Sequence, residues 1–122
     1  MKEFVFNITP IGKPRMVKSD SWRKRPTVLN YWQYKDDLKE QAEKYCYSVP
    51  EILENITFVL PMPDSWSKKK KEQMEGQPHK NKPDLDNIIK GFKDCLCEND
   101  SFVHTYNNIR KIWGISGKII IQ

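Results

Sequence analysis

The stretch "KPDLDNIIKGFKDCL", residues 82–96, has the apolar pattern of an amphipathic helix that begins just after a proline. Its apolar residues recur at three- and four-residue steps, which places them on one face of a helix that packs against a core. They are Leu85, Ile88, Ile89, Phe92, Cys95 and Leu96. A proline disfavours helical dihedrals at the residue before it, so the pattern predicts a helix over residues 84–96 with Asp84 at its N-cap.

Two carboxylates, Asp84 and Asp86, lie at the start of this expected helix. Acids at the N-cap and in the first turn complement the helix dipole and contribute ~1 kcal/mol. Because an N-cap residue has non-helical dihedrals, both side chains can also reach the mouth of the helix and bind Mg²⁺, which prefers carboxylate and phosphate oxygens. The spacing of the two acids is compatible with a cap and with a metal site.

Lys90 and Asp94 follow Asp86 at four-residue steps and share the polar face of the expected helix. Lys90 either orients water and stabilises charge in a reaction at the two acids, or forms a salt bridge worth about 0.2–0.5 kcal/mol with Asp86 or Asp94. Asp94 is interpreted as structural, as part of the charged face of the helix.

The rest of the chain predicts an α+β domain that spans residues 1–122, with a small mixed β-sheet and helices packed against it. Alternating apolar residues indicate strands, and three- and four-residue steps indicate helices. The expected elements are a strand over 3–9, a helix over 27–47, a strand over 54–61, a short helix that carries 68–71, and a C-terminal β-hairpin within 101–122. We expect Asp64 or Ser65 to cap the short helix and Gly76 to end it.

Composition points to nucleic acid as a partner. The 122 residues carry a formal net charge of +5, and 30% of them are charged. A basic surface attracts nucleic acid or an anionic membrane, and the sequence has no apolar run long enough for a signal peptide or a membrane span. Three cysteines, an odd number, indicate reduced thiols, so a cytoplasmic location is expected. A second copy of the chain would enlarge a modest core, which favours a homodimer.

Most of the excess positive charge lies in two segments, residues 12–26 and 66–82, which are expected to be loops or short helices that flank the acids in space. We interpret both as contacts to DNA phosphates. The residues concerned are Lys13, Arg15, Lys18, Arg23, Lys24, Arg25, Lys68, Lys69, Lys70, Lys71, Lys80 and Lys82. Trp22 and Trp66 lie in the same segments. Each could stack on a DNA base or pack inside the protein, and packing is favoured because an exposed tryptophan is uncommon.

A zinc site built from histidine and cysteine is disfavoured by the spacing of the ligands. Cys95 and Cys97 form a C-x-C pair, whereas structural zinc sites commonly use two to four intervening residues. Cys95 also lies on the apolar stripe, so it is expected in the core. His79 and His104 then lack cysteine partners.

The segment 82–96 resembles the signature K/R-x-D-x-D-N-x-x-K-x-x-x-D-x-L of the RusA-type Holliday junction resolvases of bacteria and phages. "GKPR", residues 12–15, resembles the basic loop that follows the first strand in that family. Residues 62–84, "MPDSWSKKKKEQMEGQPHKNKPD", resemble the connector of its phage-type members, and Lys111 falls where the family has a basic residue near the end of the chain.

The resemblance implies a homodimeric endodeoxyribonuclease that resolves four-way DNA junctions by paired nicks in recombination and repair. It implies dependence on Mg²⁺, with Mn²⁺ as an alternative ion. It implies a location in the cytoplasm of a bacterium or of a phage host. The catalytic residues that it implies are Asp84, Asp86, Lys90 and Asp100, of which the three aspartates are metal ligands.

Two departures from the family pattern leave other functions open. Asn99 stands where the family has an aspartate, and the span from Asp86 to Asp100 is a few residues short. A DNA-binding module without catalysis is therefore an alternative. A nuclease for other branched DNA, such as flaps and forks, is a third.

Overall fold

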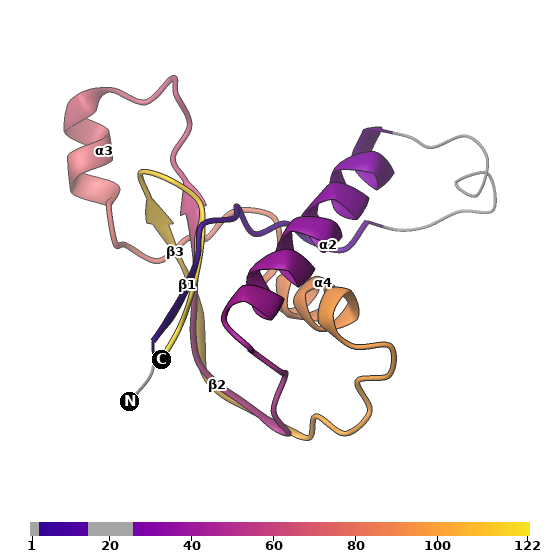
Figure 1. Cartoon of the computed structure of the whole chain (residues 1–122). Coiled ribbons are helices and arrows are strands. Elements are labelled where there is room, and N and C mark those ends of the chain that lie inside the picture. Colours follow the sequence, from indigo (N-terminus) through magenta and orange to yellow (C-terminus); the bar gives the residue numbers. More distant parts are fainter. Residues whose placement is uncertain (1–2, 15–25) are drawn as a thin grey trace.

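The computed structural model describes residues 3–14 and 26–122 and places the strands of these ranges in one mixed sheet (Figure 1). In chain order the elements are β1 Phe4–Phe6, α2 Pro26–Lys44, β2 Ile52–Pro61, α3 Lys68–Met74, α4 Leu85–Leu96, β3 Thr105–Gly114 and β4 Lys118–Ile121. The predicted α+β class, the small mixed sheet and the two C-terminal strands are confirmed.

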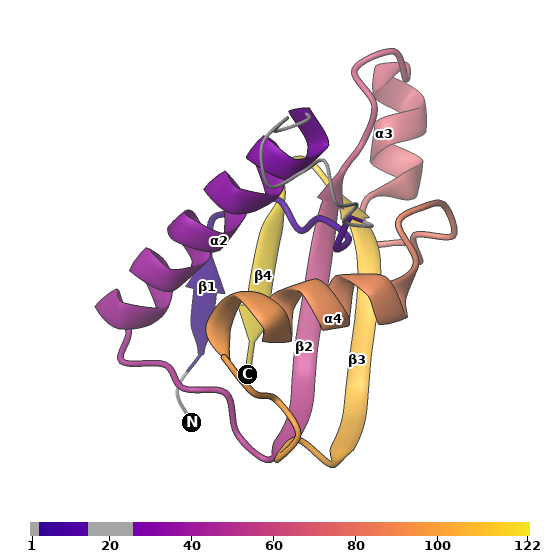
Figure 2. The ribbon, with the colours of Figure 1, turned by 90° about the vertical axis from the view of Figure 1, so that its right-hand side faces the viewer.

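β2 is an inner strand of this sheet, whose order is β1-β4-β2-β3 (Figure 2). It pairs in parallel with β3 and antiparallel with β4, and β4 pairs antiparallel with β1. All five residues from Ile56 to Leu60 are buried. Because side chains alternate between the two faces of a sheet, a run of consecutive buried residues means that both faces of this part of β2 are covered.

The pairing predicted for the two C-terminal strands is wrong, because they do not form a hairpin. β3 and β4 lie on opposite sides of β2, and each pairs with β2 instead of with the other. In the observed order the backbone N–H and C=O groups on both edges of β2 are paired, with β3 on one side and β4 on the other. The most buried strand therefore lies between the two.

Helices α2 and α4 pack on the same face of the sheet, whereas α3 stands apart from it (Figures 1 and 2). The core between these two helices and the sheet includes Phe6, Leu38, Phe58 and Phe92, each 0% exposed. The apolar stripe predicted for α4 faces this core, and Cys95 is buried in it as expected. None of the helices in the described ranges is long and apolar enough to cross a membrane.

Helix ends follow the sequence less closely than helix centres. α2 ends at Lys44, short of the expected residue 47, and Cys46 then takes a left-handed φ of 54° that turns the chain away. Ser67, rather than Asp64 or Ser65, caps α3, because its Oγ accepts a hydrogen bond from the Lys70 N–H at 3.2 Å. Gly76, with a φ of 79°, follows the end of α3 as predicted.

Candidate metal and DNA site

The N-terminal end of α4 carries Asp84 and Asp86, both exposed. Asp84 is the N-cap, with the extended dihedrals predicted for it (φ −65°, ψ 146°), yet its side chain makes no capping hydrogen bond to the helix. Asp86 lies in the first turn, where one carboxylate oxygen accepts the Asn87 N–H at 2.9 Å. Capping therefore leaves the Asp84 carboxylate available for a ligand.

Lys111, on β3, holds the segment that leads into these acids. Its Nζ donates hydrogen bonds to the backbone carbonyls of Asn81 at 2.5 Å and Pro83 at 2.6 Å. Pro83 directly precedes Asp84 and follows a cis peptide bond with Lys82. The sequence identified Lys111 only as a basic residue, because its contacts join residues 28 and 30 positions apart and leave no local signal.

The loop after β1 packs directly against the first turns of α4. The Lys13 N–H donates to the Asn87 carbonyl at 3.4 Å, and the Asn87 side-chain amide donates to the Lys13 carbonyl at 3.2 Å. A Cβ on Gly12 would lie 2.5 Å from the Asn87 side-chain nitrogen, and one on Gly91 would lie 3.3 Å from the Lys13 nitrogen. Glycines at these positions let the described part of the basic loop approach the acid end of α4.

Asp94, farther along α4, is fully engaged with neighbouring elements. It accepts a hydrogen bond of 2.6 Å from the Tyr31 hydroxyl of α2, and Lys13 Nζ lies 3.2 Å from its other oxygen. Partial burial alone would raise the pKa of Asp94, but the bonds from Tyr31 and Lys13 outweigh it and lower the pKa below its ordinary value. These contacts give Asp94 the structural role expected of it.

Lys90 is exposed, and within residues 3–14 and 26–122 its side chain forms no ion pair with Asp86 or Asp94. The salt bridge considered for Lys90 is therefore absent from that part of the chain. The ammonium lies one turn beyond Asp86, on the open side of the helix.

Asp100 lies beyond the other end of α4, where its carboxylate is 3.3 Å from Lys93 Nζ. The twelve residues of α4 span about 18 Å, so one chain does not bring Asp100 to the acids at the N-terminal end. Among the described residues, no group of three or more His, Cys, Asp or Glu side chains is arranged to hold a metal ion. One chain thus carries Asp84 and Asp86 at the N-terminal end of α4 and Asp100 beyond the opposite end.

The basic residues predicted to contact DNA fall in two groups. The lysines of α3 and the following segment are exposed or half-buried on a projecting part of the molecule (Figure 2). They are Lys68, Lys69, Lys70, Lys71, Lys80 and Lys82. The predictions for Arg15, Lys18, Trp22, Arg23, Lys24 and Arg25 lie outside the described residues.

Trp66 packs against Trp113 of β3, with the ring centroids 4.8 Å apart, and Lys70 Nζ lies 4.2 Å from the Trp66 ring. The favoured interpretation of Trp66 as a packing residue therefore agrees with these contacts. Its partners were not evident in the sequence, because Trp113 is 47 positions away on another element.

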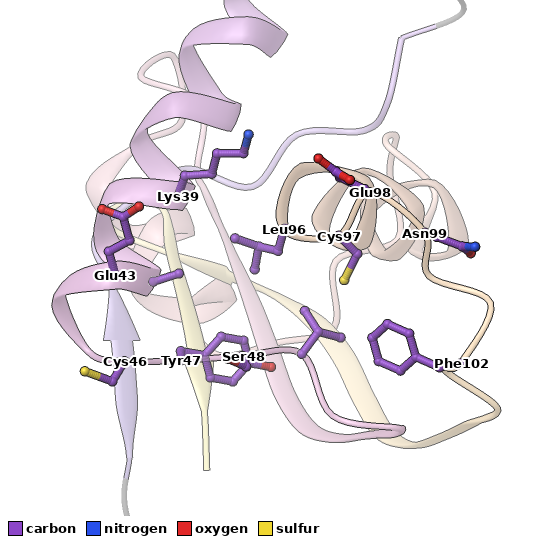
Figure 3. Close-up of a pocket in the computed structure, with 12 residues that line it drawn as sticks. Lys39, Glu43, Cys46, Tyr47, Ser48, Leu96, Cys97, Glu98, Asn99 and Phe102 are labelled. Carbon is purple, nitrogen blue, oxygen red and sulfur yellow. The ribbon is translucent and has the colours of Figure 1, made fainter.

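A hollow of about 740 Å³ lies at the C-terminal end of α4, away from the two acids (Figure 3). Lys39 and Glu43 of α2, the segment after that helix, and Leu96, Cys97 and Phe102 line it. Asp84 and Asp86 do not line it. Both acids are exposed at the start of α4, where a polymer such as DNA can reach them.

The donor set at the acid end fits a hard divalent cation. Mg²⁺ is typically held by one or two carboxylates together with substrate phosphates, and keeps several waters. Two exposed carboxylates, one of them not used in capping, meet that requirement. The neighbouring lysines supply the opposite charge that a phosphate backbone needs.

The comparison with family models agrees with this geometry. A model described as endodeoxyribonuclease RusA matches residues 6–122, which is nearly the whole chain and includes all the acids discussed above. Among curated proteins, none matches the sequence. Members of this family are endodeoxyribonucleases of Holliday junctions and generally use a divalent metal. With its acids at the start of α4 and a match over almost its full length, the chain belongs to the RusA family of endodeoxyribonucleases.

Proposed function

We propose that this protein resolves four-way DNA junctions by paired nicks, in a reaction that depends on Mg²⁺ or, in its place, Mn²⁺. The observation that carries the proposal is the Asp84 carboxylate, which occupies the N-cap of α4 without capping it. The pathway is DNA recombination and repair, in the cytoplasm of a bacterium or of a phage host.

Each residue at the acid end has a proposed role. Asp84 and Asp86 hold the metal, and a phosphate of the DNA completes its coordination. When bound, the metal neutralises the scissile phosphate and makes water a better nucleophile at neutral pH. Lys90, exposed one turn beyond Asp86, stabilises the charge that develops on the phosphate. Lys111 is a positioning residue, because it binds the backbone just before Asp84.

The basic residues of the two segments that precede the acids are proposed to contact phosphates and to guide the junction arms. Their exposure on and after α3 supports this role. The Lys13 ammonium also forms an ion pair with Asp94, so it can contact DNA only through an N–H donor that does not point at Asp94. The proposed set is Lys13, Arg15, Lys18, Arg23, Lys24, Arg25, Lys68, Lys69, Lys70, Lys71, Lys80 and Lys82.

Paired nicks need two active sites, which supports a homodimer. Asp100 is the third metal ligand in this proposal, and the length of α4 keeps it from the acid end of its own chain. A two-fold axis perpendicular to α4 would bring the opposite ends of two such helices together. Asp100 of the partner subunit is therefore proposed to complete each site with Asp84 and Asp86.

The decisive variant is Asp86→Asn, which keeps the shape of the side chain and removes its charge. We expect it to abolish cleavage of a synthetic four-way junction in Mg²⁺ while gel-shift binding of the same junction persists. Asp36→Asn, the same change at an exposed position on α2, is the matched control and should cut normally. Cleavage by the Asp86→Asn protein at the wild-type rate would refute the assignment.

A DNA-binding module without catalysis is the second candidate. The lack of a three-ligand group within the described residues of one chain favours it. This hypothesis predicts that the wild-type protein binds the four-way junction. With Mg²⁺ or Mn²⁺ it would not nick the junction, a flap, a fork or a duplex. Cleavage of flaps or forks in preference to the junction would instead identify a nuclease for other branched DNA.

A further inference from the structure

A hollow of about 380 Å³ lies between α3, the segment 77–81 and the end of β3, apart from the two acids. Aromatic rings, ammonium groups and side-chain amides line it together. The lining includes Trp66, Trp113, Lys70, Lys80, Gln77 and Asn81. None of the described residues that line this hollow is acidic.

Backbone hydrogen bonds fix one wall of this hollow, where the segment after α3 meets β3. The segment after α3 runs along the outer edge of β3, and the bonds Gly76 N–H to Trp113 O, Trp113 N–H to Gln77 O and His79 N–H to Lys111 O join them at 2.9–3.1 Å. These bonds hold the backbone of this wall in place before any ligand binds.

The aromatic wall has one fixed and one accessible member. Trp113 is 6% exposed and lies between Trp66 and the buried ring of His79, whose centroid is 4.1 Å from it. Burial, and then the charge of Lys111, lower the pKa of His79, so this support is neutral at pH 7. Trp66 is only half-buried, and the Lys70 ammonium lies 4.2 Å from the centre of its ring. Because the Lys70 side chain is exposed, it can move aside for a base and still neutralise the phosphate of that base.

The chemistry of the lining selects a planar ring attached to an anion. Tryptophan faces stack on aromatic rings, and Lys70 and Lys80 attract negative charge. The side-chain amides of Gln77 and Asn81 can hydrogen-bond the edge of a base. A nucleobase with its phosphate combines all three features.

The hollow and the acid end of α4 form one unit. Lys111 Nζ binds the carbonyl of Asn81, which belongs to the hollow, and the carbonyl of Pro83, which precedes Asp84. Asn81 and Asp84 are three residues apart, so their Cα atoms are separated by at most about 11 Å. Nucleotides near one another on a single strand can therefore occupy both places.

We propose that this hollow binds one unstacked nucleobase of the DNA substrate, against Trp66, while a nearby phosphate of the same strand lies at Asp84 and Asp86. The base site itself needs only the hollow; its placement beside the cut rests on the proposed function. Branched DNA suits such a site, because bases at a branch point have fewer stacking neighbours than bases inside a duplex.

The test uses protein that carries Asp86→Asn and a thymine oligonucleotide of about ten nucleotides with one 2-aminopurine. This base loses fluorescence when it stacks on an aromatic ring, so binding should quench it. Trp66→Leu should abolish the quenching and weaken binding between about 5-fold and about 150-fold, whereas Trp66→Tyr should largely preserve both. Trp32→Leu, the same change on α2, is the matched control and should bind like the parent.

A second measurement remains decisive if Trp66→Leu perturbs folding. A four-way junction is made with single abasic positions scanned around its centre, and its affinity for the Asp86→Asn protein is measured. One abasic position should weaken binding as much as Trp66→Leu does, and the two changes together should cost no more than either alone. Two outcomes would overturn the base site. One is that the losses from Trp66→Leu and from the abasic change are additive at every abasic position of the junction, and the other is that the protein does not quench the 2-aminopurine of the oligonucleotide. Neither assay requires cleavage, so failure of the nuclease proposal leaves this result readable.

Discussion

Both ends of α4 carry aspartate and lysine side chains, but those near the C-terminal end are bound to other parts of the fold and those at the N-terminal end are exposed. Near the C-terminal end, Asp94 binds Tyr31 and Lys13, and Lys93 binds Asp100. At the N-terminal end, the Asp84 carboxylate caps nothing although it occupies the N-cap. A helix can thus use charge to join elements of the fold at one end and keep charge exposed for a ligand at the other.

The paired charges have measurable consequences for ionisation. Partial burial opposes the charged form of Lys93, but its contacts with Tyr106 and Asp100 outweigh it and raise its pKa. Asp94 shows the mirror case, with a pKa lowered by Tyr31 and Lys13. Each of these charges is held by the fold. Removing the charge of Asp94 should therefore change stability, whereas removing charge at the acid end should change function. Asp100 is the exception at the C-terminal end, because it is also the proposed metal ligand of the partner's site.

The largest expected effect is on cleavage, for Asp84→Asn. Loss of a residue that only hydrogen-bonds a metal ligand can lower activity by up to about a hundredfold. Loss of the ligand itself should cost at least as much, so we expect activity to fall by about a hundredfold or more. Stability should not change, because the lost carboxylate caps nothing and asparagine is itself a good N-cap residue. Four-way junction nicking and thermal unfolding measure the two. A clear drop in Tm with normal nicking would make this end as structural as the other.

Mixed dimers sharpen the comparison, because they test whether the two ends of α4 meet across a dimer. Protein with Asp84→Asn and protein with Asp100→Asn should each be inactive. If Asp100 acts in the partner's site, a mixed dimer carries both substitutions in one site and none in the other, so mixing should restore nicking of one strand. If Asp84 and Asp100 of one chain instead act in the same site, each site of a mixed dimer carries one substitution. Mixing the two proteins then restores no nicking.

A lysine pair contrasts the two ends directly. Lys90→Ala should lower nicking by about a hundredfold, as removal of a charge-stabilising donor does, without changing Tm. Lys93→Ala should lower nicking only about tenfold, because it removes the ion-pair partner of the proposed ligand Asp100, and should cost ~1 kcal/mol or less of stability because that pair is partly exposed. Denaturant unfolding and initial rates on the junction distinguish them. Equal effects of the two variants on nicking would erase the proposed difference.

The smallest change in function, with a clear change in stability, is expected for Asp94→Ala. The buried Tyr31 hydroxyl loses its acceptor, which costs about 1–3 kcal/mol. Because the folded pKa of Asp94 is lowered, its stabilisation is complete above the ordinary pKa near 4 and is lost as the pH falls through the lower folded value. Urea unfolding at pH 7 and pH 3 should show the difference from wild type shrinking in acid. Asp36→Ala, which changes an exposed aspartate of α2, should unfold like wild type at both pH values.

Local signals in the sequence predicted α4 well and strand pairing poorly. Pro83, the N-cap at Asp84 and the apolar steps lie within one stretch, so the start of α4 and its buried face followed from it. The cap of α3 was misplaced among nearby candidates, because Asp64, Ser65 and Ser67 are all good N-cap residues. The hairpin was wrong because β2, which separates β3 from β4, lies more than forty residues earlier in the chain.

By itself, the sequence determined the acid end of α4, its basic surroundings and the family resemblance that the family model confirms. These depend on residue types and short spacings, which a linear pattern contains. The tertiary structure alone decided which charges have partners. Whether Asp94 or Lys90 is paired depends on residues from other elements, such as Tyr31 and Lys13, and the clamp of Lys111 on Pro83 joins β3 to the loop before α4. Contacts between distant segments form only when the sheet and helices pack, so no local pattern could reveal them.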